Sequence, residues 1–292
     1  MRSRRPVRAV VTACGLLLLA GCGTGPDETG SAASTSGDDA PVATTSRGDV
    51  TAEGEYRPEM AASVDLPQAD PPAVVVLVPG GGWSSADPTG LAPLAATLSE
   101  AGLAVVTITY GTSRTDDHYP IPADDVACGV SYAAAQVPDV PVVVLGHSAG
   151  AHLAALVGLV PDRGSGDTCP SPSHAADAVV GLAGPYDVAA TGGLARSLFG
   201  VDQGEDPDLW DEGNPVLRAA ERPDVPFLLV HGDADDVVPV EFTTTFGDAL
   251  EAADHDVTIR ILPAVDHSTV YAAEVVGDVV VRWVERVVIG AT

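Results

Sequence analysis

Apolar residues follow two kinds of pattern along the chain from residue 73 onward. Short, nearly continuous apolar runs predict strands that are buried on both faces. These runs cover residues 73–78, 104–109, 140–145, 178–182, 227–230 and 257–262. The segments between them have helix-like apolar spacing and cover residues 91–101, 123–135, 149–160, 240–253 and 269–288. This alternation predicts an α/β fold with a mostly parallel central sheet and helices on both faces.

Ligands in such sheets bind beyond the carboxyl ends of the strands, so the residues after each strand are the candidates for chemistry. After the run at 140–145 the chain reads Gly-His-Ser-Ala-Gly and then continues with helical spacing. A G-x-S-x-G sequence between a buried strand and a helix is typical of a sharp turn that presents its serine above the sheet. The pattern therefore predicts Ser148 as a nucleophile.

Three other strand ends carry the groups that a serine nucleophile requires. Residues 79–83 read Pro-Gly-Gly-Gly-Trp, and the glycines leave backbone N–H groups free to stabilise an oxyanion. Asp235 lies in an acidic turn after the fifth run, and His267 follows the sixth. Histidine has the unperturbed pKa that suits a base near neutral pH, and a carboxylate can orient it. The order Ser, Asp, His is the one expected of a hydrolase built on this sheet.

Together these motifs resemble the α/β-hydrolase superfamily, specifically its esterase/lipase branch with an HGGGW-type oxyanion loop. The resemblance covers residues 70–288 and implies an α/β-hydrolase fold. Because the sequence holds no large inserted domain, we expect no large cap domain. It implies that Ser148 is the nucleophile, that His267 is the general base and later the acid, and that Asp235 orients His267.

The resemblance also implies an oxyanion hole built from backbone N–H groups, those of Gly81, Gly82 and Ala149. One residue departs from the pattern, because Pro79 stands where the family's loop begins with His. Proline cannot form a hydrogen bond through its side chain, although its fixed φ can stiffen the loop. We expect the hole to persist, since its donors are backbone groups of later residues. Trp83, at the end of the loop, is expected to form a wall of the pocket.

Composition and resemblance lead to one preferred activity and two alternatives. The resemblance implies a serine hydrolase that cleaves small-molecule carboxylic esters through an acyl-enzyme, without a cofactor. The sequence before residue 73 holds no long cap segment, which predicts an open pocket and a preference for small acyl groups. An arylformamidase, amidase or peptidase on the same fold is one alternative. A catalytically inactive lipoprotein that binds a ligand is the other. The sequence gives no indication of oligomeric state.

The acidic turn after the fifth run allows two other interpretations. His231, Asp233, Asp235 and Asp236 together resemble a metal-binding cluster. Calcium loops use a longer series of oxygen ligands, so no metal is expected here. Asp233 is the alternative to Asp235 as the acid that orients His267.

The net charge of the chain excludes several kinds of partner. The 292 residues carry 41 Asp plus Glu against 14 basic residues, a formal net charge of −27. Nucleic-acid binding needs a basic surface that releases counterions from phosphates, so such a function is excluded. The same charge disfavours anionic substrates and electrostatic attachment to anionic lipid.

The N-terminal residues have the composition of an export signal. Four arginines are followed by the 11 apolar residues 10–20, a stretch shorter than the roughly 20 residues that a membrane-spanning helix needs. The sequence Leu-Ala-Gly-Cys at 19–22 resembles the bacterial lipobox, which implies cleavage after residue 21 and lipidation of Cys22. A lipid there would hold the protein on the outer face of the cell membrane. An ordinary secretory signal is the alternative.

The mature chain is expected to consist of a tether and one catalytic domain. Residues 22–49 hold almost no large apolar side chains and predict a disordered tether. The folded domain is expected to cover residues 50–292. Cys128 and Cys169 remain after Cys14 is removed with the signal and Cys22 is lipidated. Outside the cytoplasm they can form a disulfide, and two buried free thiols are the alternative.

Overall fold

The structure is a computed structural model that describes residues 50–161 and 169–290. The chain divides into two units, Met1–Thr44 and Thr45–Thr292, and the second unit contains the whole sheet. The signal at 1–21, the lipidated Cys22 and most of the tether at 22–49 belong to the first unit, and all of them lie outside the described residues. Within the described residues, no helix has both the length and the apolar character needed to cross a bilayer.

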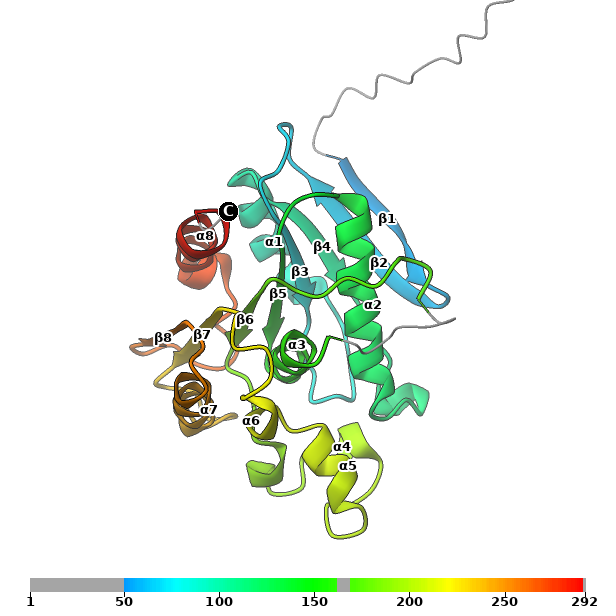
Figure 1. Ribbon diagram of the computed structural model, residues 1–292, viewed down its shortest axis with the longest axis vertical. Helices are drawn as coiled ribbons and strands as arrows, with labels where there is room; N and C mark the ends of the chain where they lie inside the picture. The colour runs from blue at the N-terminus through cyan, green and yellow to red at the C-terminus, as the bar shows by residue number, and fades with distance from the viewer. Residues whose placement is uncertain (1–49, 162–168, 291–292) are drawn as a thin grey trace, which may run out of the picture. The chain divides into compact units, whose positions relative to one another are not determined.

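One sheet runs through the second unit in the strand order β1-β2-β4-β3-β5-β6-β7-β8 (Figure 1). Its parallel part consists of β3 (Val74–Val78), β4 (Ala104–Ile108), β5 (Val142–His147), β6 (Ala178–Leu182), β7 (Phe227–Gly232) and β8 (Val257–Leu262). Each of these strands lies where the apolar runs predict one. The predicted α/β fold with a mostly parallel sheet is therefore confirmed.

Two strands at one edge of the sheet were not predicted. β1 (Val50–Arg57) pairs with β2 (Met60–Leu66), and β2 pairs with β4, both in the antiparallel sense. Only alternate residues of β2 are buried, and β1 is mostly polar, so neither strand has the continuous apolar run of the buried strands. Pairing with β4 stabilises a segment whose own sequence gives a weak signal.

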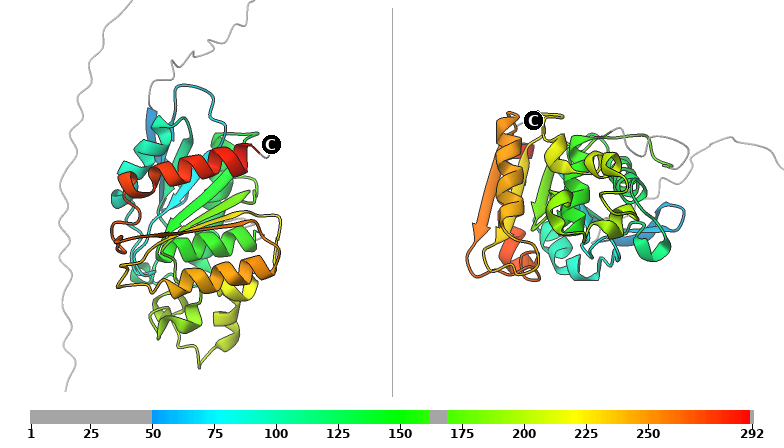
Figure 2. Two further views of the ribbon diagram at one scale, coloured as in Figure 1. Left: turned by 90° about the vertical axis from the view of Figure 1, so that its left-hand side faces the viewer. Right: turned by 90° about the horizontal axis from the view of Figure 1, so that it is seen from below.

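Helices cover both faces of the sheet and form two separate cores. On one face lie α2 (Ile121–Gln136), α3 (Ala149–Leu159) and α7 (Glu241–Ala252). On the other lie α1 (Ala92–Glu100) and α8 (Asp278–Trp283). The left view of Figure 2 shows α8 in red on one side of the sheet and α3 and α7 on the other. Alternate residues of β3 enter each core, which explains why the whole strand is apolar.

The last helix begins later than predicted. Helical spacing predicted a helix over 269–288, whereas the chain first makes turns and then enters a π-helical turn at Ala273–Gly277. α8 follows, and a second π-helical turn ends at Ile289. The residues just after His267 therefore belong to a loop, in which the side chain and backbone of Thr269 bond to Asp266.

The segment between β6 and β7 forms short helices beyond the carboxyl edge of the sheet. It contains the 3-10 turn Val188–Thr191 and the helices α4 (Arg196–Phe199), α5 (Pro207–Glu212) and α6 (Pro215–Arg218). Trp210 is buried and stacks on Phe199 at 4.5 Å between ring centroids, so it serves packing within this insert. Elsewhere in the domain, Cys128 of α2 is joined by a disulfide to Cys169.

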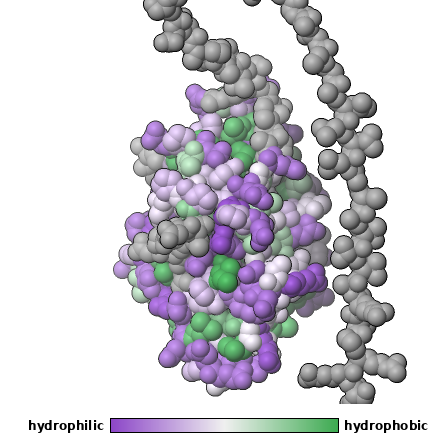
Figure 3. Space-filling view, turned by 90° about the vertical axis from the view of Figure 1, so that its right-hand side faces the viewer, coloured by the Kyte–Doolittle hydropathy of each residue, from purple (hydrophilic) through white to green (hydrophobic). Residues whose placement is uncertain are grey.

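The second unit presents a largely hydrophilic surface on the face seen in Figure 3. Figure 3 shows hydrophilic residues over most of one face of the second unit, with apolar residues in small separate patches.

Candidate active site

Ser148 lies on the sharp turn that joins β5 to α3. Its backbone has φ 53° and ψ −122°, a conformation that non-glycine residues rarely adopt. The turn is possible because Gly146 and Gly150 flank it. A Cβ on Gly146 would collide with the backbone of Gly150, and one on Gly150 would collide with the carbonyl of Val78. The two glycines thus allow β3, β5 and α3 to meet closely while the serine stays partly exposed.

Three predicted residues meet at the carboxyl edge of the sheet. The Nε2 atom of His267 lies 3.0 Å from Oγ of Ser148. The Nδ1 atom of the same ring lies 2.7 Å from Oδ2 of Asp235. A carboxylate oxygen accepts, so Nδ1 carries the hydrogen and Nε2 is free to accept from the serine hydroxyl. This is the tautomer that a general base needs.

Asp235 is buried and ionised beside His267. Its side chain is 1% exposed, and Oδ1 accepts hydrogen bonds from the backbone N–H groups of Val237 at 2.9 Å and Val238 at 2.8 Å. Burial alone would raise the pKa of this carboxyl, but the bonds from Val238, His267 and Val237 outweigh it and hold the pKa below its usual value. The carboxylate is therefore available to stabilise an imidazolium.

The alternative acid, Asp233, occupies a different position. Its Oδ1 accepts a hydrogen bond from the backbone N–H of Ala264 at 2.6 Å, and its side chain is exposed. Asp233 therefore ties the turn after β7 to the loop after β8, while Asp235 bonds to His267. Within the described residues, no group of three or more His, Cys, Asp or Glu side chains is arranged to hold a metal ion.

The loop after β3 brings backbone N–H groups close to the serine turn. Gly81 and Gly82 have φ values of 132° and 58°, which L-residues with side chains rarely adopt. Ala149 is the first residue of α3, whose first N–H groups have no intrahelical acceptor. In the described part of the chain, the N–H groups of these three residues donate to no protein acceptor. They remain available for an oxyanion.

Trp83 anchors this loop and does not form a wall of the pocket, contrary to the prediction. Its side chain is 3% exposed, and its indole Nε1 donates to Nδ1 of His152 on α3 at 3.3 Å. The other nitrogen of His152 donates to the carbonyl of Gly213 at 2.9 Å. The backbone N–H of Ser113 donates to the carbonyl of Trp83 at 3.0 Å. These bonds keep Trp83 in a left-handed conformation, φ 55°, and hold the end of the loop against α3.

His147 contacts His267, the candidate general base, through a hydrogen bond and through ring packing. Its Nε2 donates to the backbone carbonyl of His267 at 3.0 Å, and its ring packs against those of His267 and Tyr271. Burial and the nearby His267 ring lower the pKa of His147 to about 3, so its imidazole is neutral. The sequence placed His147 in the serine turn but gave no signal for this bond, which links residues that are 120 positions apart.

A cavity of about 400 Å³ opens beside Ser148 and His267. The loop after β3, residues 79–83, which we call the glycine loop, forms one wall with its residues 79–82, and Asp87, Leu91, Val237 and Tyr271 contribute the others. The carboxylate of Asp87 is held by the backbone N–H and the hydroxyl of Thr89, at 3.0 and 2.6 Å. The hydroxyl bond and then the N–H bond lower the pKa of Asp87, so an anion lies at the rim of the cavity.

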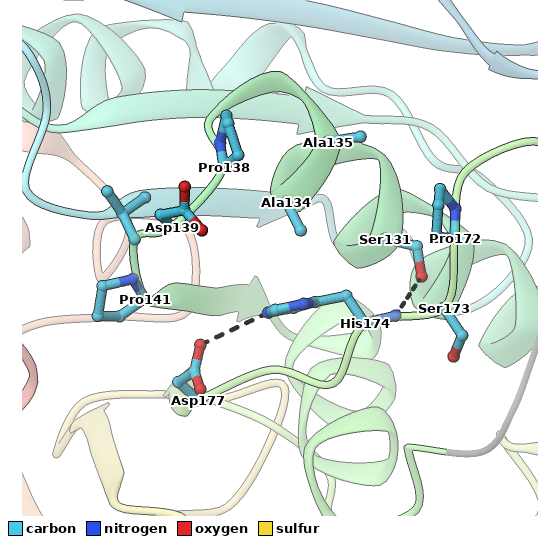
Figure 4. A pocket seen from close by; sticks show the side chains of 11 residues that line it. Ser131, Ala134, Ala135, Pro138, Asp139, Pro141, Pro172, Ser173, His174 and Asp177 are labelled. Carbon is cyan, nitrogen blue, oxygen red and sulfur yellow. Dashed lines mark hydrogen bonds and ion pairs between the residues drawn. The ribbon is translucent and has the colours of Figure 1, made fainter.

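A second, somewhat larger hollow lies at the opposite edge of the sheet and lacks this chemistry (Figure 4). It is bounded by residues that precede β5 and β6, such as Pro141 and Asp177. Nε2 of His174 lies 3.7 Å from Oδ2 of Asp177, and the backbone N–H of His174 donates to Oγ of Ser131 at 3.1 Å. Ser131 in turn donates to the carbonyl of Ala127, so its hydroxyl is engaged with backbone groups and contacts no general base.

The sheet order, the helices on both faces and the serine turn after β5 define the α/β-hydrolase fold, which solved esterase structures share. The model of the BD-FAE family matches residues 64–250, and the chain belongs to this α/β-hydrolase esterase family.

The chain is also similar to individual proteins. It is 32% identical over 209 residues to esterase LipC of Mycobacterium tuberculosis, an alignment that covers 64% of this chain and 50% of LipC. It is 28% identical over 203 residues to the probable isoprenylcysteine alpha-carbonyl methylesterase ICMEL1 of Arabidopsis thaliana, covering 62% of this chain and 42% of that protein. The chain thus spans about half the length of the curated relatives it matches.

Solved structures with the same fold include two esterases. A truncated carbohydrate esterase from gut microbiota superposes with a TM-score of 0.68 at 22% identity, covering 82% of this chain and 97% of that one. The butyrate-bound esterase Est2 of Thermogutta terrifontis superposes with a TM-score of 0.69 at 18% identity, covering 81% of this chain and 94% of that one. Because both sequence identities are below 25%, these two structures show that the fold is shared and nothing more.

Proposed function

We propose that the protein is a serine hydrolase that cleaves carboxylic esters. The observation that carries this proposal is the continuous chain of bonds from Ser148 through His267 to Asp235, with distances of 3.0 and 2.7 Å. A serine hydroxyl is a weak nucleophile until a positioned base takes its proton. Membership of the BD-FAE family and the esterase relatives support the same reaction class.

In the proposed reaction, Oγ of Ser148 attacks the ester carbonyl while its proton passes to Nε2 of His267. Asp235 stabilises the imidazolium that forms. The negative oxygen of the tetrahedral intermediate accepts hydrogen bonds from the N–H groups of Gly81, Gly82 and Ala149. His267 then returns the proton to the leaving alcohol, and an acyl-enzyme remains. Water, deprotonated by the same imidazole, attacks the acyl-enzyme and releases the acid.

We further propose that the acyl group is small. The cavity measures about 400 Å³, and the carboxylate of Asp87 and the backbone of the glycine loop interrupt its apolar lining. A long alkyl chain would need a continuous apolar channel, because burying its methylenes is what stabilises its binding. The fold relative Est2 has been solved with butyrate and with propionate bound, which agrees with a short acyl group.

The experiment compares the full chain with Ser148→Ala on p-nitrophenyl acetate, butyrate and octanoate, and on an aryl formamide. Loss of the nucleophile should lower kcat/KM by ~10³-fold or more. Ser131→Ala is the matched control, since it removes another partly enclosed serine hydroxyl that lies near a histidine. It should leave the rate within about twofold of wild type.

Two outcomes would contradict the proposal. Equal rates for wild type and Ser148→Ala, together with no labelling of wild type by a fluorophosphonate, would exclude a serine hydrolase. Faster turnover of the formamide than of any ester would assign the site to amide hydrolysis. Preference for octanoate over acetate would overturn the small-acyl proposal alone.

We also propose that the protein is exported and anchored through a lipid on Cys22. The support is the basic start, the apolar stretch at 10–20 and the Leu-Ala-Gly-Cys sequence at 19–22. In a bacterial host, Cys22→Ala should move the protein from the membrane fraction to the soluble fraction and abolish palmitate labelling. Equal labelling of both proteins would contradict the lipid anchor.

A further inference from the structure

Asp235 contacts two imidazole rings. Its Oδ2 lies 2.7 Å from Nδ1 of His267 and 3.2 Å from Nε2 of His231. Two backbone N–H groups bind its other oxygen. The second imidazole belongs to β7, four residues before the carboxylate, and plays no part in the proton transfers proposed above.

His231 is held in one orientation and one tautomer. The side chain is fully buried. Its Nε2 lies 2.9 Å from the carbonyl oxygen of Val238, and a carbonyl only accepts, so Nε2 carries the hydrogen. Its Nδ1 lies 2.7 Å from Oγ1 of Thr243 on α7, whose hydroxyl can donate to a bare nitrogen. Burial is the main reason why the pKa of His231 is lowered, and it keeps the ring neutral.

We infer that His231 is a positioning residue for the proposed ester hydrolysis, and that its Nε2–H fixes the rotation of the Asp235 carboxylate. The inference rests on the proposed function. The N–H of Nε2 donates to the carbonyl of Val238, and Oδ2 of Asp235 lies 3.2 Å from the same nitrogen. The turn and the carboxylate are therefore held next to one fixed point on β7. Oδ2 then faces His267. A small displacement of the Asp235 carboxylate would also move His267, and the rate of ester hydrolysis would fall because the base must stay within hydrogen-bond reach of Ser148.

The uncharged state of the His231 ring is part of its proposed role. The titratable groups that interact with His231 are Asp235, His267 and the neutral His147, and α7 presents to it the uncharged hydroxyl of Thr243. A cation in place of the neutral ring would cancel the charge of Asp235 and repel an imidazolium on His267. A neutral donor orients the carboxylate and leaves its charge available to His267.

The test uses two amide substitutions in the full chain. In His231→Gln the side-chain amide reaches the position of Nε2 and can still donate to Asp235. In His231→Asn the shorter amide reaches only the position of Nδ1, so the bond to Thr243 can form and the donor to Asp235 is lost. We expect kcat for p-nitrophenyl acetate to fall about 30-fold in the Asn variant and less than about fivefold in the Gln variant, with KM within about threefold in both.

His255 supplies a matched control for the loss of a buried histidine. Its Nδ1 and Nε2 lie 2.8 Å from the carbonyls of Val225 and Ala219, and its side chain is buried, as is that of His231. His255→Asn should lower Tm and leave kcat within about twofold of wild type when assayed well below Tm.

Several results would overturn the inference. Equal kcat for the Asn and Gln variants, or wild-type kcat in the Asn variant, would show that the donor at Nε2 does not matter. A loss in His255→Asn as large as in His231→Asn would assign the effect to stability. If the Asn variant does not fold, nitrogen-15 NMR of wild type decides: the Nε2–H tautomer of His231 at pH 7.5 supports the inference, and any other form overturns it. If the proposed function itself is wrong, the wild-type protein will hydrolyse no ester. If only the inference about His231 is wrong, wild type will still hydrolyse esters.

Discussion

The hydroxyl of Tyr110 donates a hydrogen bond to the backbone carbonyl of Pro79 at 3.0 Å. Tyr110 follows β4, and Pro79 is the first residue of the glycine loop, so the bond ties the start of that loop to the neighbouring strand. Burial raises the pKa of Tyr110 well above its usual value, which keeps the hydroxyl protonated and able to donate. The loop that lacks a histidine side chain at residue 79 is thus held through its main chain.

Tyr110→Phe removes this one bond and keeps the ring. The Pro79 carbonyl would lose a buried partner, at a cost of about 1–3 kcal/mol in unfolding free energy, and the N–H groups of Gly81 and Gly82 would be less well placed. We expect kcat for p-nitrophenyl acetate to fall about tenfold with little change in KM. The control Tyr119→Phe removes a hydroxyl that bonds to Glu212 in the insert and should leave kcat nearly unchanged. Unchanged kcat in Tyr110→Phe would contradict the role of the bond.

Asp87 should make the cavity select against anionic esters. Oδ1 accepts both bonds from Thr89, and the group is ionised at the rim of the cavity that holds Ser148. Mono-p-nitrophenyl succinate should therefore be a poorer substrate than p-nitrophenyl butyrate. Asp87→Asn should raise the succinate-to-butyrate ratio of kcat/KM about threefold at low salt and less at high salt, because salt screens exposed charges.

Asp254→Asn is the control for net charge, since this exposed aspartate precedes β8 at the opposite edge of the sheet. It should leave the ratio unchanged. Equal ratios for wild type and Asp87→Asn would show that Asp87 does not act on the substrate.

Asp125 should make stability depend on pH. The side chain is fully buried, forms an ion pair with Arg57 and accepts from the N–H of Gly111 at 2.7 Å. Burial outweighs these partners and raises the pKa from 3.8 to about 6. Because the folded state binds this proton more tightly, the contribution is fully present below pH 4 and is lost as pH rises through about 6.

Urea unfolding of wild type and Asp125→Asn at pH 4 and pH 7 measures this contribution. At roughly 1.4 kcal/mol per pKa unit, the free energy of unfolding of wild type relative to the variant should decrease by up to about 3 kcal/mol between the two values. The comparison cancels the effect of the other carboxyl groups. A relative stability that stays constant, or that increases with pH, would show that the burial of Asp125 does not dominate.

The disulfide between Cys128 and Cys169 should stabilise the domain without affecting the chemistry. It closes a loop with a sequence separation of 41, and the Cα atoms are 5.4 Å apart. The chain-entropy model gives ~4 kcal/mol for a loop of this size. Replacing both cysteines by alanine should lower Tm clearly, while kcat at 20 °C stays within about twofold. A reductant should lower Tm of wild type and leave that of the variant unchanged; equal Tm values would show that the bridge does not form in solution.

The sequence predicts Ser148 as the nucleophile and His267 as its base, and it offers Asp235, with Asp233 as the alternative, as the acid. A buried strand, a G-x-S-x-G turn and a helix in succession specify Ser148 through local geometry alone. Asp235 and Asp233 are two residues apart in one acidic turn, and their spacing could not separate them. The fold does so, because Asp233 bonds to Ala264 and Asp235 bonds to His267.

Residues that act through tertiary contacts gave no local signal. His147 bonds to the backbone of His267, Trp83 to His152 and Tyr110 to Pro79, and each pair joins different elements of the chain. The strands β1 and β2 escaped detection for a related reason. β2 pairs with β4 and β1 pairs with β2, and these pairings stabilise the two strands more than their own apolar content does.

The sequence by itself determined the parallel α/β layout, the serine turn and the order of the residues that bear the chemistry. These follow from apolar periodicity and from the backbone freedom of glycine, both of which act over a few neighbouring residues. Tertiary structure alone decided which carboxylate faces His267, how a loop that starts with Pro79 is held, and where His231 points. Each of these depends on hydrogen bonds between segments far apart in the chain, and such bonds are set only when the sheet brings the strand ends together.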